Sequence, residues 1–524
     1  MILLFLKKTN LNLRLTKEGE EEIYEIEFTK NINNREISDL KESDLIALWE
    51  NSLLILNNLK NNQNHQIFSS MNFTQNDIEN YKIFNEIMKN LEEEKKILTQ
   101  SIKKGYGTIN EINNIIENGK LMVKKDNNQI VNFEEFIFTL EKEIKNYQKE
   151  IVEAYEKYYT LTFFYGNQFI KIYEIIKNEM IDLSEIEPYF KFLTGNWNIE
   201  EPKKLNVIEQ NETKFQKINR HLKNYLDSSG INDFSKIFNE YIIKPEFYRF
   251  ESGIYLKKYL KDPEKDIILL IYYLTNNFPL TSTVLFCKNT TSEEEVLAFF
   301  YRFLKCEFNI PFVILNFPVL KSDIKLKMVD LLNDKKNIKL NACLFFMIKE
   351  EKENEFMNYF YKNKLSIKTV PNFLREVENN LINKIKNSCD AEILDSKICG
   401  FGKTALINEF AEKKQMKLVT FPIGYINSID KIINNLKKLD LKGNKVILHL
   451  NIYDTRNNDL LQELLFYLIF TSIINYKGNI FFLKSNVKII IEVPSGFFYF
   501  YDKCKILSLI SIKEIISREI FLNC

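Results

Sequence analysis

The chain is poor in the residues that build metal and disulfide sites. Its 524 residues include only three histidines, and its seven cysteines lie far apart without any Cys-x-x-Cys pair. A structural zinc site needs closely spaced cysteine and histidine ligands, and a disulfide framework needs many cysteines in a short chain. The sequence therefore argues against both kinds of site, and its dispersed cysteines fit a reducing compartment.

A strong excess of charge is also missing. Lys and Arg together number 72 and Asp and Glu number 71, which leaves a formal net charge of +1 at pH 7. Proteins that attract nucleic acid or an anionic membrane surface through their overall field carry a clear basic excess. The composition therefore predicts no nucleic-acid partner.

The sequence has no long apolar run. The opening MILLFL stops at Lys7 and Lys8, and the longest apolar run near the end, LLFYLIFTSII, covers residues 464–474. The first run is too short for the apolar part of a secretion signal, and a membrane-spanning helix needs about 18 apolar residues or more. We therefore predict a cytoplasmic protein with no transmembrane segment, in which 464–474 belongs to a buried helix.

The first part of the chain, residues 1–245, has mainly helical patterns. Amphipathic stretches at 37–59, 77–104 and 133–166 are separated by short polar breaks. In the last of them Glu and Lys recur about four residues apart, which is typical of a solvated helix face. Long antiparallel helices form an arm or a bundle rather than a catalytic pocket. We therefore predict a helical arm or bundle here, as one of the about three or four domains for which the length leaves room.

Residues 246–384 change to alternating strands and helices. Four short β-rich runs are each followed by a helical pattern: 282–287, 312–317, 341–349 and 365–370. Such alternation is typical of parallel βαβ units, and Ser292 with Glu295 forms a capping box at the start of one helix. With 282–287 as the first strand, a phosphate loop would occupy 288–292, where the sequence has no glycine. We therefore predict an α/β domain without a phosphate loop.

The stretch at 391–414, AEILDSKICGFGKTALINEFAEKK, has the order strand, glycine-containing loop, helix. The Walker A pattern is Gly, four residues, then Gly-Lys-Ser/Thr, because the loop must aim successive backbone N–H groups at phosphate oxygens. Gly402-Lys403-Thr404 supplies the second half, whereas the first glycine position is Lys397. Gly400 partly restores the missing backbone freedom. The alternative to a nucleotide loop is a glycine-rich turn before a helix.

The chemistry of a nucleotide loop assigns a role to each of its residues. Lys403 is expected on the β- and γ-phosphates, Thr404 on Mg²⁺, and the backbone N–H groups of the loop and helix start around the phosphates. The predicted nucleotide contacts are Ser396, Cys399, Gly400, Phe401, Gly402, Lys403, Thr404, Ala405 and Asn451. The predicted cofactors are ATP and Mg²⁺, and no residue is predicted to be catalytic.

The rest of 385–524 continues the alternation. Strands are predicted at 417–423, 445–451 and 487–493, and helices at 428–440 and 459–475. The strand KVILHLN is of the buried kind that carries the Mg²⁺-holding acid in P-loop enzymes, but it ends in Asn451, followed by Ile452. Asp454 is the other candidate for the metal position. His449 lies between two leucines and is predicted to be a core histidine with hydrogen-bond partners.

With these features in place, the chain resembles the mysterin family of giant E3 ubiquitin ligases, whose core is a dynein-like row of AAA+ units on one chain. Within about residues 270–500, the matching stretches are STVLFCKNTTSEEEVLAFFYRFLK, FVILNF, SKICGFGKTALINEFAEKKQMKLV, KVILHLNI, LLQELLFYLIF, YKGNIFFL and VKIIIEV. In that family's second AAA+ unit the loop also lacks its first glycine. That unit holds ATP without readily hydrolysing it, and the first unit is degenerate.

The resemblance implies a fold and a set of partners. The fold consists of α/β P-loop NTPase units of the AAA+ type, with parallel sheets and flanking helices, preceded by a mostly α-helical arm. The arm covers 1–245, a degenerate AAA+-like domain covers 246–384, and a P-loop domain without its lid covers 385–524. The partners are nucleotide and further AAA+ units of the same or a companion chain. The family's ubiquitin-transfer residues have no matching positions in this sequence.

Three functions remain open on the sequence alone. The first is an ATP-binding core segment of a mysterin-like E3 ubiquitin ligase, which holds nucleotide structurally with little or no hydrolysis. The second is a free-standing P-loop NTPase or phosphotransferase, which needs a carboxylate where Asn451 lies. The third is a helical interaction scaffold with an inactive P-loop, although an unused loop need not keep both Lys403 and Thr404.

Overall fold

The computed structural model describes the chain between residues 9 and 514 with gaps. The described residues are 9–18, 21–29, 42–60, 75–103, 106, 111–117, 120–124, 129–177, 183–194, 212–228, 234–244, 250, 252–259, 262–334, 340–361, 367–370, 374–396, 402–424, 428–439, 441, 445–453, 458–476, 478–494 and 504–514. The chain divides into two compact units, Met1–Glu153 and Ala154–Cys524, with the boundary inside helix α5 (Phe133–Lys157). Among the described residues, no helix combines the length and the apolar character needed to cross a membrane.

The N-terminal unit contains an antiparallel sheet of five strands in the order β2-β1-β3-β4-β5. The strands are β1 (Thr9–Glu18), β2 (Glu21–Thr29), β3 (Glu111–Glu117), β4 (Lys120–Lys124) and β5 (Ile130–Asn132). Two of the predicted helices are confirmed as α2 (Glu42–Lys60) and α4 (Gln75–Lys103), and Phe84 and Leu91 of α4 share a buried core with Leu121 of β4. The sequence predictions contain no such sheet.

Helices open the second unit. The end of α5 leads through a 3₁₀ turn (Tyr159–Phe163) to the helices α6 (Asn167–Lys177), α7 (Leu183–Thr194), α8 (Lys214–Ser228) and α9 (Ser235–Phe238). The helix predicted over 133–166 therefore ends at Lys157. Threonines and aromatic residues follow it, and these lose side-chain freedom in a helix. They pack instead, and the rings of Phe163 and Phe234 stack with centroids 5.5 Å apart.

The first α/β domain has a parallel sheet in the order β10-β6-β9-β8-β7. Its strands are β6 (Gly253–Tyr259), β7 (Val284–Phe286), β8 (Pro311–Leu315), β9 (Cys343–Lys349) and β10 (Lys368–Thr369). Its helices are α10 (Pro263–Thr275), α11 (Glu293–Leu304), α12 (Ser322–Asp334), α13 (Glu353–Tyr361) and α14 (Leu374–Ser388). At the start of α11 the N–H of Glu295 donates to Oγ of Ser292 at 3.2 Å, which confirms the predicted cap.

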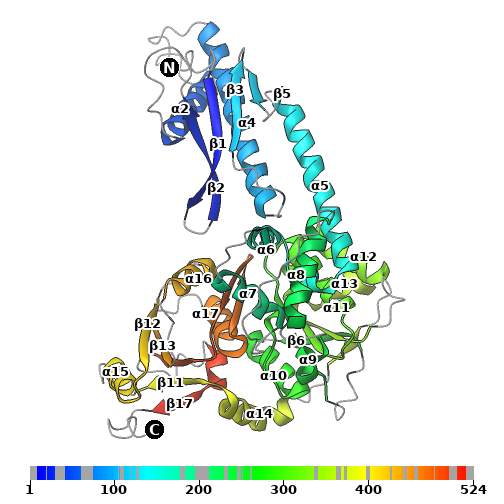
Figure 1. The fold of residues 1–524 in the computed structure, drawn as a ribbon, viewed down its shortest axis with the longest axis vertical. Helices are drawn as coiled ribbons and strands as arrows, with labels where there is room; N and C mark the ends of the chain where they lie inside the picture. Colours follow the sequence, from blue (N-terminus) through cyan, green and yellow to red (C-terminus); the bar gives the residue numbers. More distant parts are fainter. Residues whose placement is uncertain are drawn as a thin grey trace. The chain divides into compact units, whose positions relative to one another are not determined.

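The second α/β domain, coloured from yellow to red in Figure 1, has a parallel sheet in the order β12-β13-β16-β11-β17. Its strands are β11 (Ala391–Asp395), β12 (Lys417–Ile423), β13 (Val446–Ile452), β16 (Val487–Glu492) and β17 (Ser511–Glu514). Its helices are α15 (Lys403–Lys413), α16 (Ile429–Lys437) and α17 (Asn458–Leu465). A hairpin of β14 (Ile473–Tyr476) and β15 (Asn479–Phe482) precedes β16.

The two parallel sheets have the same strand order. We number the strands of each domain along the chain and leave the hairpin aside. Across the sheet the order is then fifth, first, fourth, third, second, read from β10 in the first domain and from β17 in the second. The predicted parallel sheets with flanking helices are therefore present. One buried apolar cluster contains side chains of both domains, including Ile267 and Phe345 of the first and Ile393 and Leu448 of the second.

The position at which a phosphate loop would be expected in this domain was predicted after the wrong strand. Residues 282–287 were predicted to be the first strand of the domain, but β6 is the first and β7 is the second. A phosphate loop would follow β6, where Leu260, Lys261 and Asp262 lead directly to Pro263. This connection contains no glycine either.

The helix predicted over 459–475 is shorter in the structure. α17 passes into a π-helical turn (Phe466–Thr471), and Ser472 follows with a φ of 56°. Residues 473–475 belong to β14, so the helix prediction is wrong for them. Ile473 and Ile474 are β-branched, and such residues favour strands. The burial predicted for this apolar run is confirmed, since Leu464 and Phe466 are fully buried.

Candidate functional site

The loop predicted to bind phosphate joins β11 to α15. Ser396, at its start, is buried, and its N–H donates to Oδ1 of Asp395 at 2.7 Å. Three of the predicted contacts, Cys399, Gly400 and Phe401, lie outside the described residues. Gly402 closes the loop with a φ of 78°, a left-handed conformation that favours glycine over residues with a side chain. The chain therefore turns sharply immediately before the helix begins.

Lys403 and Thr404 begin α15 and both bond to the end of β16. Lys403 is 7% exposed, and its Nζ donates to the backbone carbonyl of Val493, the residue after the strand. Thr404 is exposed, and its Oγ1 donates to Oε2 of Glu492 at 2.8 Å. Within the described first turn of α15 there is no acidic residue. Ala405 is exposed on the same turn.

Asn451, the remaining predicted contact, lies near the end of β13. It is partly buried and is in register with Glu492 of β16. Glu492 is also in register with Leu394 of β11. Its strand, β16, therefore lies between β11, the first strand of the domain, and β13, the third. Asp454, the other candidate for the metal position, lies outside the described residues. Glu492 was not among the predicted site residues, although an acid at the end of the apolar strand VKIIIEV could have indicated a metal ligand.

Glu492 is held as an anion by its neighbours. Burial raises the pKa of its carboxyl, but hydrogen bonds from His449 and Thr404 and the charges of His449 and Lys403 outweigh burial and leave the pKa below its usual range. The two sides of His449 are both occupied: Nε2 lies 3.0 Å from Oε2 of Glu492, and Nδ1 lies 3.2 Å from Oγ1 of Thr420. The prediction of a core histidine with partners is confirmed, because His449 is completely buried.

These groups fit a phosphate ligand accompanied by Mg²⁺. The N-terminus of a helix and a lysine ammonium attract phosphate oxygens. A threonine hydroxyl and a carboxylate are hard oxygen ligands of the kind that Mg²⁺ prefers. In the described parts of the chain, no group of three or more His, Cys, Asp or Glu side chains could hold a metal ion by itself. Mg²⁺ in nucleotide sites needs only one or two protein ligands beside phosphate and water.

The corresponding position in the first α/β domain is acidic. Asp262 precedes α10 with a φ of 56°, and Glu264 and Asp266 lie in the first turn of the helix. Glu264 is 6% exposed, and burial, together with the charges of Glu463, Asp459 and Asp262, raises its pKa to about 8. The start of α10 therefore carries acidic side chains where the start of α15 carries a lysine.

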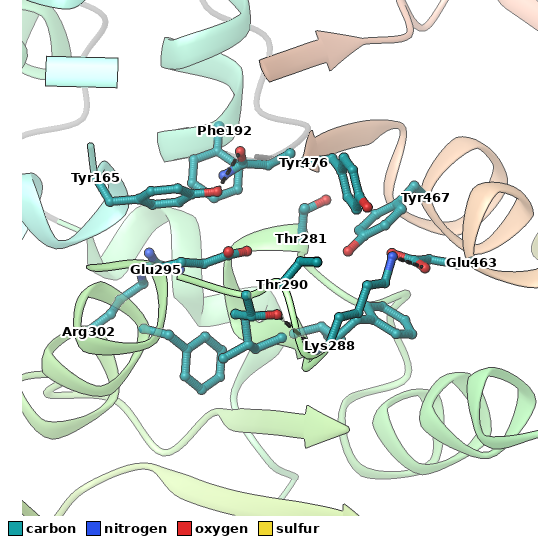
Figure 2. Close-up of a pocket in the computed structure, with 16 residues that line it drawn as sticks. Tyr165, Phe192, Thr281, Lys288, Thr290, Glu295, Arg302, Glu463, Tyr467 and Tyr476 are labelled. Carbon is teal, nitrogen blue, oxygen red and sulfur yellow. Dashed lines mark hydrogen bonds and ion pairs between the residues drawn. The ribbon is translucent and has the colours of Figure 1, made fainter. Parts of the chain in front are cut away.

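Lys288, Thr290 and Thr291 line a small cavity of about 50 Å³, shown in Figure 2. Nζ of Lys288 lies 2.7 Å from Oε2 of Glu463 in α17 and 4.5 Å from the ring centroid of Tyr476 in β14. The N–H of Lys288 donates to Oγ1 of Thr291 at 2.8 Å. Lys288 therefore joins the two α/β domains by an ion pair.

Arg302 forms a second buried junction beside this cavity. It is 4% exposed, and its guanidinium donates to the backbone carbonyls of Thr162 and Ser282. Burial lowers its pKa to about 10. The guanidinium also lies over the ring of Phe163, 4.7 Å from its centroid. Arg302 thus connects the 3₁₀ turn after α5 to the residues before β7.

No protein-family model matches the chain, and no curated protein matches it.

Proposed function

We propose that this chain is an ATP-binding core segment of a mysterin-like E3 ubiquitin ligase, in which only the second α/β domain holds nucleotide. The bound ATP stabilises the fold and is turned over slowly or not at all. The observation that carries the proposal is the position of Lys403 and Thr404, at the start of the helix that follows β11 and beside the end of β16.

The strand order supports this choice of site. In open parallel sheets, ligands bind outside the carboxyl ends of the strands, where the connections leave two neighbouring strands in opposite directions. The connection from β11 leads towards β12, and the chain after β16 leads to β17 on the other side of β11. Lys403 and Glu492 lie at this crevice.

The residues around the crevice favour binding over hydrolysis. Efficient phosphoryl transfer needs a metal held by an acid and a group that orients the attacking water. Asn451 offers a neutral amide where the third strand would carry the acid, and Ile452 beside it is buried and apolar. Nucleotide that stays bound raises stability by mass action. We infer further that the segment works in the cytoplasm beside additional AAA+ units.

A second candidate function has one observation in its favour. A P-loop NTPase or phosphotransferase needs a carboxylate at this edge of the sheet, and Glu492 supplies one from β16. Phosphate release by the chain separates this candidate from a nucleotide that is only bound.

Calorimetric titration of the full chain with ATP tests the proposed site. We expect one ATP per chain, and Lys403→Ala should weaken binding by about 2 to 4 kcal/mol, because a buried charge-assisted contact is lost. Lys413→Ala, an exposed lysine in the last turn of the same helix, is the matched control and should leave the affinity unchanged. Equal affinities for wild type and Lys403→Ala, or two ATP molecules per chain, would contradict the proposal.

A further inference from the structure

We propose that Glu492 takes over the role of the acid missing from β13 and supplies the anionic oxygen for the Mg²⁺ that accompanies bound nucleotide. The inference rests on the proposed function and names the residue that would make the nucleotide site depend on metal. It also extends the metal assignment, because the sequence prediction places Thr404 on Mg²⁺ and considers only Asn451 and Asp454 for the second position.

The first argument is the distance between Thr404 and Glu492. Their oxygens, Oγ1 and Oε2, lie 2.8 Å apart. Two ligands at right angles on an octahedral Mg²⁺, each about 2.0 to 2.1 Å from the ion, lie about 2.9 Å from one another. The hydroxyl and the carboxylate therefore have the separation of neighbouring Mg²⁺ ligands. The side chain of Glu492 is 13% exposed, which leaves it accessible from the crevice.

The second argument is the register of the sheet. Glu492 lies directly beside Asn451 on the neighbouring strand. Neighbouring strands are about 4.8 Å apart, so moving the acid from β13 to β16 keeps it at the same edge. It also brings the acid next to β11, the strand that leads into the loop and α15. A glutamate side chain is long enough to reach Thr404, as its hydrogen bond demonstrates.

The third argument is the support behind the carboxylate. Nε2 of His449 lies 3.0 Å from Oε2 of Glu492, and a carboxylate can only accept, so the imidazole donates this bond. The other ring nitrogen lies 3.2 Å from the hydroxyl of Thr420 on β12. Groups that hydrogen-bond to a metal ligand fix its orientation. His449 is therefore a positioning residue, which holds Glu492 from the core side of the sheet.

The experiment measures how strongly Mg²⁺ tightens ATP binding to the full chain, with titrations in Mg²⁺ and in EDTA. We expect Mg²⁺ to raise the ATP affinity of the wild type by about 10- to 100-fold, as for one added contact to a charged group. Glu492→Gln should lose most of this gain and keep its affinity in EDTA, because its amide oxygen can still accept a hydrogen bond from Thr404 or His449. Adding Asn451→Asp to Glu492→Gln should restore part of the gain, since it returns an acid to β13.

Each outcome of these titrations bears on the inference. An equal gain from Mg²⁺ in wild type and Glu492→Gln overturns it, while Lys403-dependent ATP binding would leave the proposed function standing. A loss in EDTA as large as the loss in Mg²⁺ also overturns it, because Glu492 would then be only structural. A wild type that binds no ATP in either solution contradicts the proposed function and this inference together.

A variant that keeps the charge covers the case in which Glu492→Gln fails to fold, which thermal melting would reveal. Glu492→Asp should retain a gain from Mg²⁺ that lies between wild type and no gain, because its shorter carboxylate reaches Thr404 less well. If neither Glu492 nor Asn451 faces the metal, the gain in ATP affinity from Mg²⁺ should be the same in Glu492→Asp as in wild type and should persist in Asn451→Ala. That result would overturn the inference.

Discussion

The two parallel sheets share a strand order, but the helices that follow their first strands begin in opposite electrostatic settings. α15 begins with Lys403 after a left-handed glycine, and its described first turn has no acid. α10 begins with Pro263 after Asp262 and has two further acids in its first turn. The two domains therefore share a strand order and differ in the side chains at this helix end. Under the proposed function, these side chains determine which of the two domains holds nucleotide.

The largest expected effect is on the rate at which the full chain, with both α/β domains, hydrolyses ATP. Efficient transfer needs a metal held by an acid, and the third strands β8 and β13 both lack an acid at their ends. An arginine directed at the γ-phosphate is alone worth about 10³ to 10⁵ in rate. We expect phosphate release from ATP and Mg²⁺ by the full chain to stay far below the roughly 1 s⁻¹ of slow kinases. Turnover near that rate, abolished by Lys403→Ala, would promote the phosphotransferase candidate.

The acidic end of α10 leads to a prediction about pH. The pKa of Glu264 is raised to about 8 in the folded chain, so the folded state binds its proton more tightly than the unfolded state. Stability from this group is complete below its unfolded pKa and is lost as the pH rises towards 8. Glu264→Gln, which resembles the protonated form, should raise the free energy of unfolding at pH 8 by about 3 kcal/mol.

Thermal melts at pH 5 and pH 8 check this prediction. The advantage of Glu264→Gln over wild type should be large at pH 8 and small at pH 5. Glu412→Gln, at an exposed position of α15, is the control and should show no such difference. An advantage that is the same at both pH values would show that Glu264 carries no unfavourable charge.

Breaking the ion pair of Lys288 with Glu463 should lower the stability of the fold and leave nucleotide binding unchanged. Lys288→Met should lower the free energy of unfolding by about 2 kcal/mol, because it leaves a buried carboxylate unpaired. This figure allows for the partial exposure of Lys288, whose side chain is 27% exposed. The ATP affinity should not change, since residues 288–292 form a junction rather than a phosphate site. Denaturant titration and calorimetry measure the two quantities.

The double variant Lys288→Met, Glu463→Gln is the matched test of the ion pair. It should recover part of the stability, because the carboxylate is no longer left charged and unpaired. A loss of ATP affinity in Lys288→Met would instead return these residues to a nucleotide role.

The smallest expected effect comes from the glycine before α15. Gly402→Ala should cost about 1 kcal/mol of folding stability, because its φ of 78° is unfavourable for a residue with a β-carbon. Ala405→Ser, at an exposed position in the same turn, should change stability by less than about 0.5 kcal/mol. Equal unfolding midpoints for Gly402→Ala and wild type would show that the left-handed turn is not required.

Much of the fold could be predicted from local patterns. The strands β8, β12 and β13 were visible as apolar runs, and α12 as an amphipathic stretch with the bounds that it has in the structure. β1 was missed although Leu11, Leu13 and Leu15 alternate with polar residues, because two of those polar residues are asparagines, which are uncommon in strands. β6 was missed because two adjacent lysines interrupt its apolar run.

The candidate site could be predicted only in part, for a different reason. Lys403 and Thr404 follow from a motif whose residues are adjacent in sequence. Glu492 lies about 90 residues further along the chain, and only the pairing of β16 with both β11 and β13 brings it to Thr404. The misplaced loop of the first α/β domain has a different cause, because β6 was not predicted and β7 was therefore counted as the first strand.

The apolar cluster shared by the two α/β domains makes protease sensitivity a common property of both. Side chains such as Ile267 of α10 and Ile393 of β11 belong to the same buried cluster, so exposing one domain uncovers part of the other. A ligand that binds only the folded state lowers the population of open forms by mass action. Proteases that cleave open forms respond to that population. If ATP binds at α15 as proposed, it should therefore slow cleavage in the first α/β domain as well.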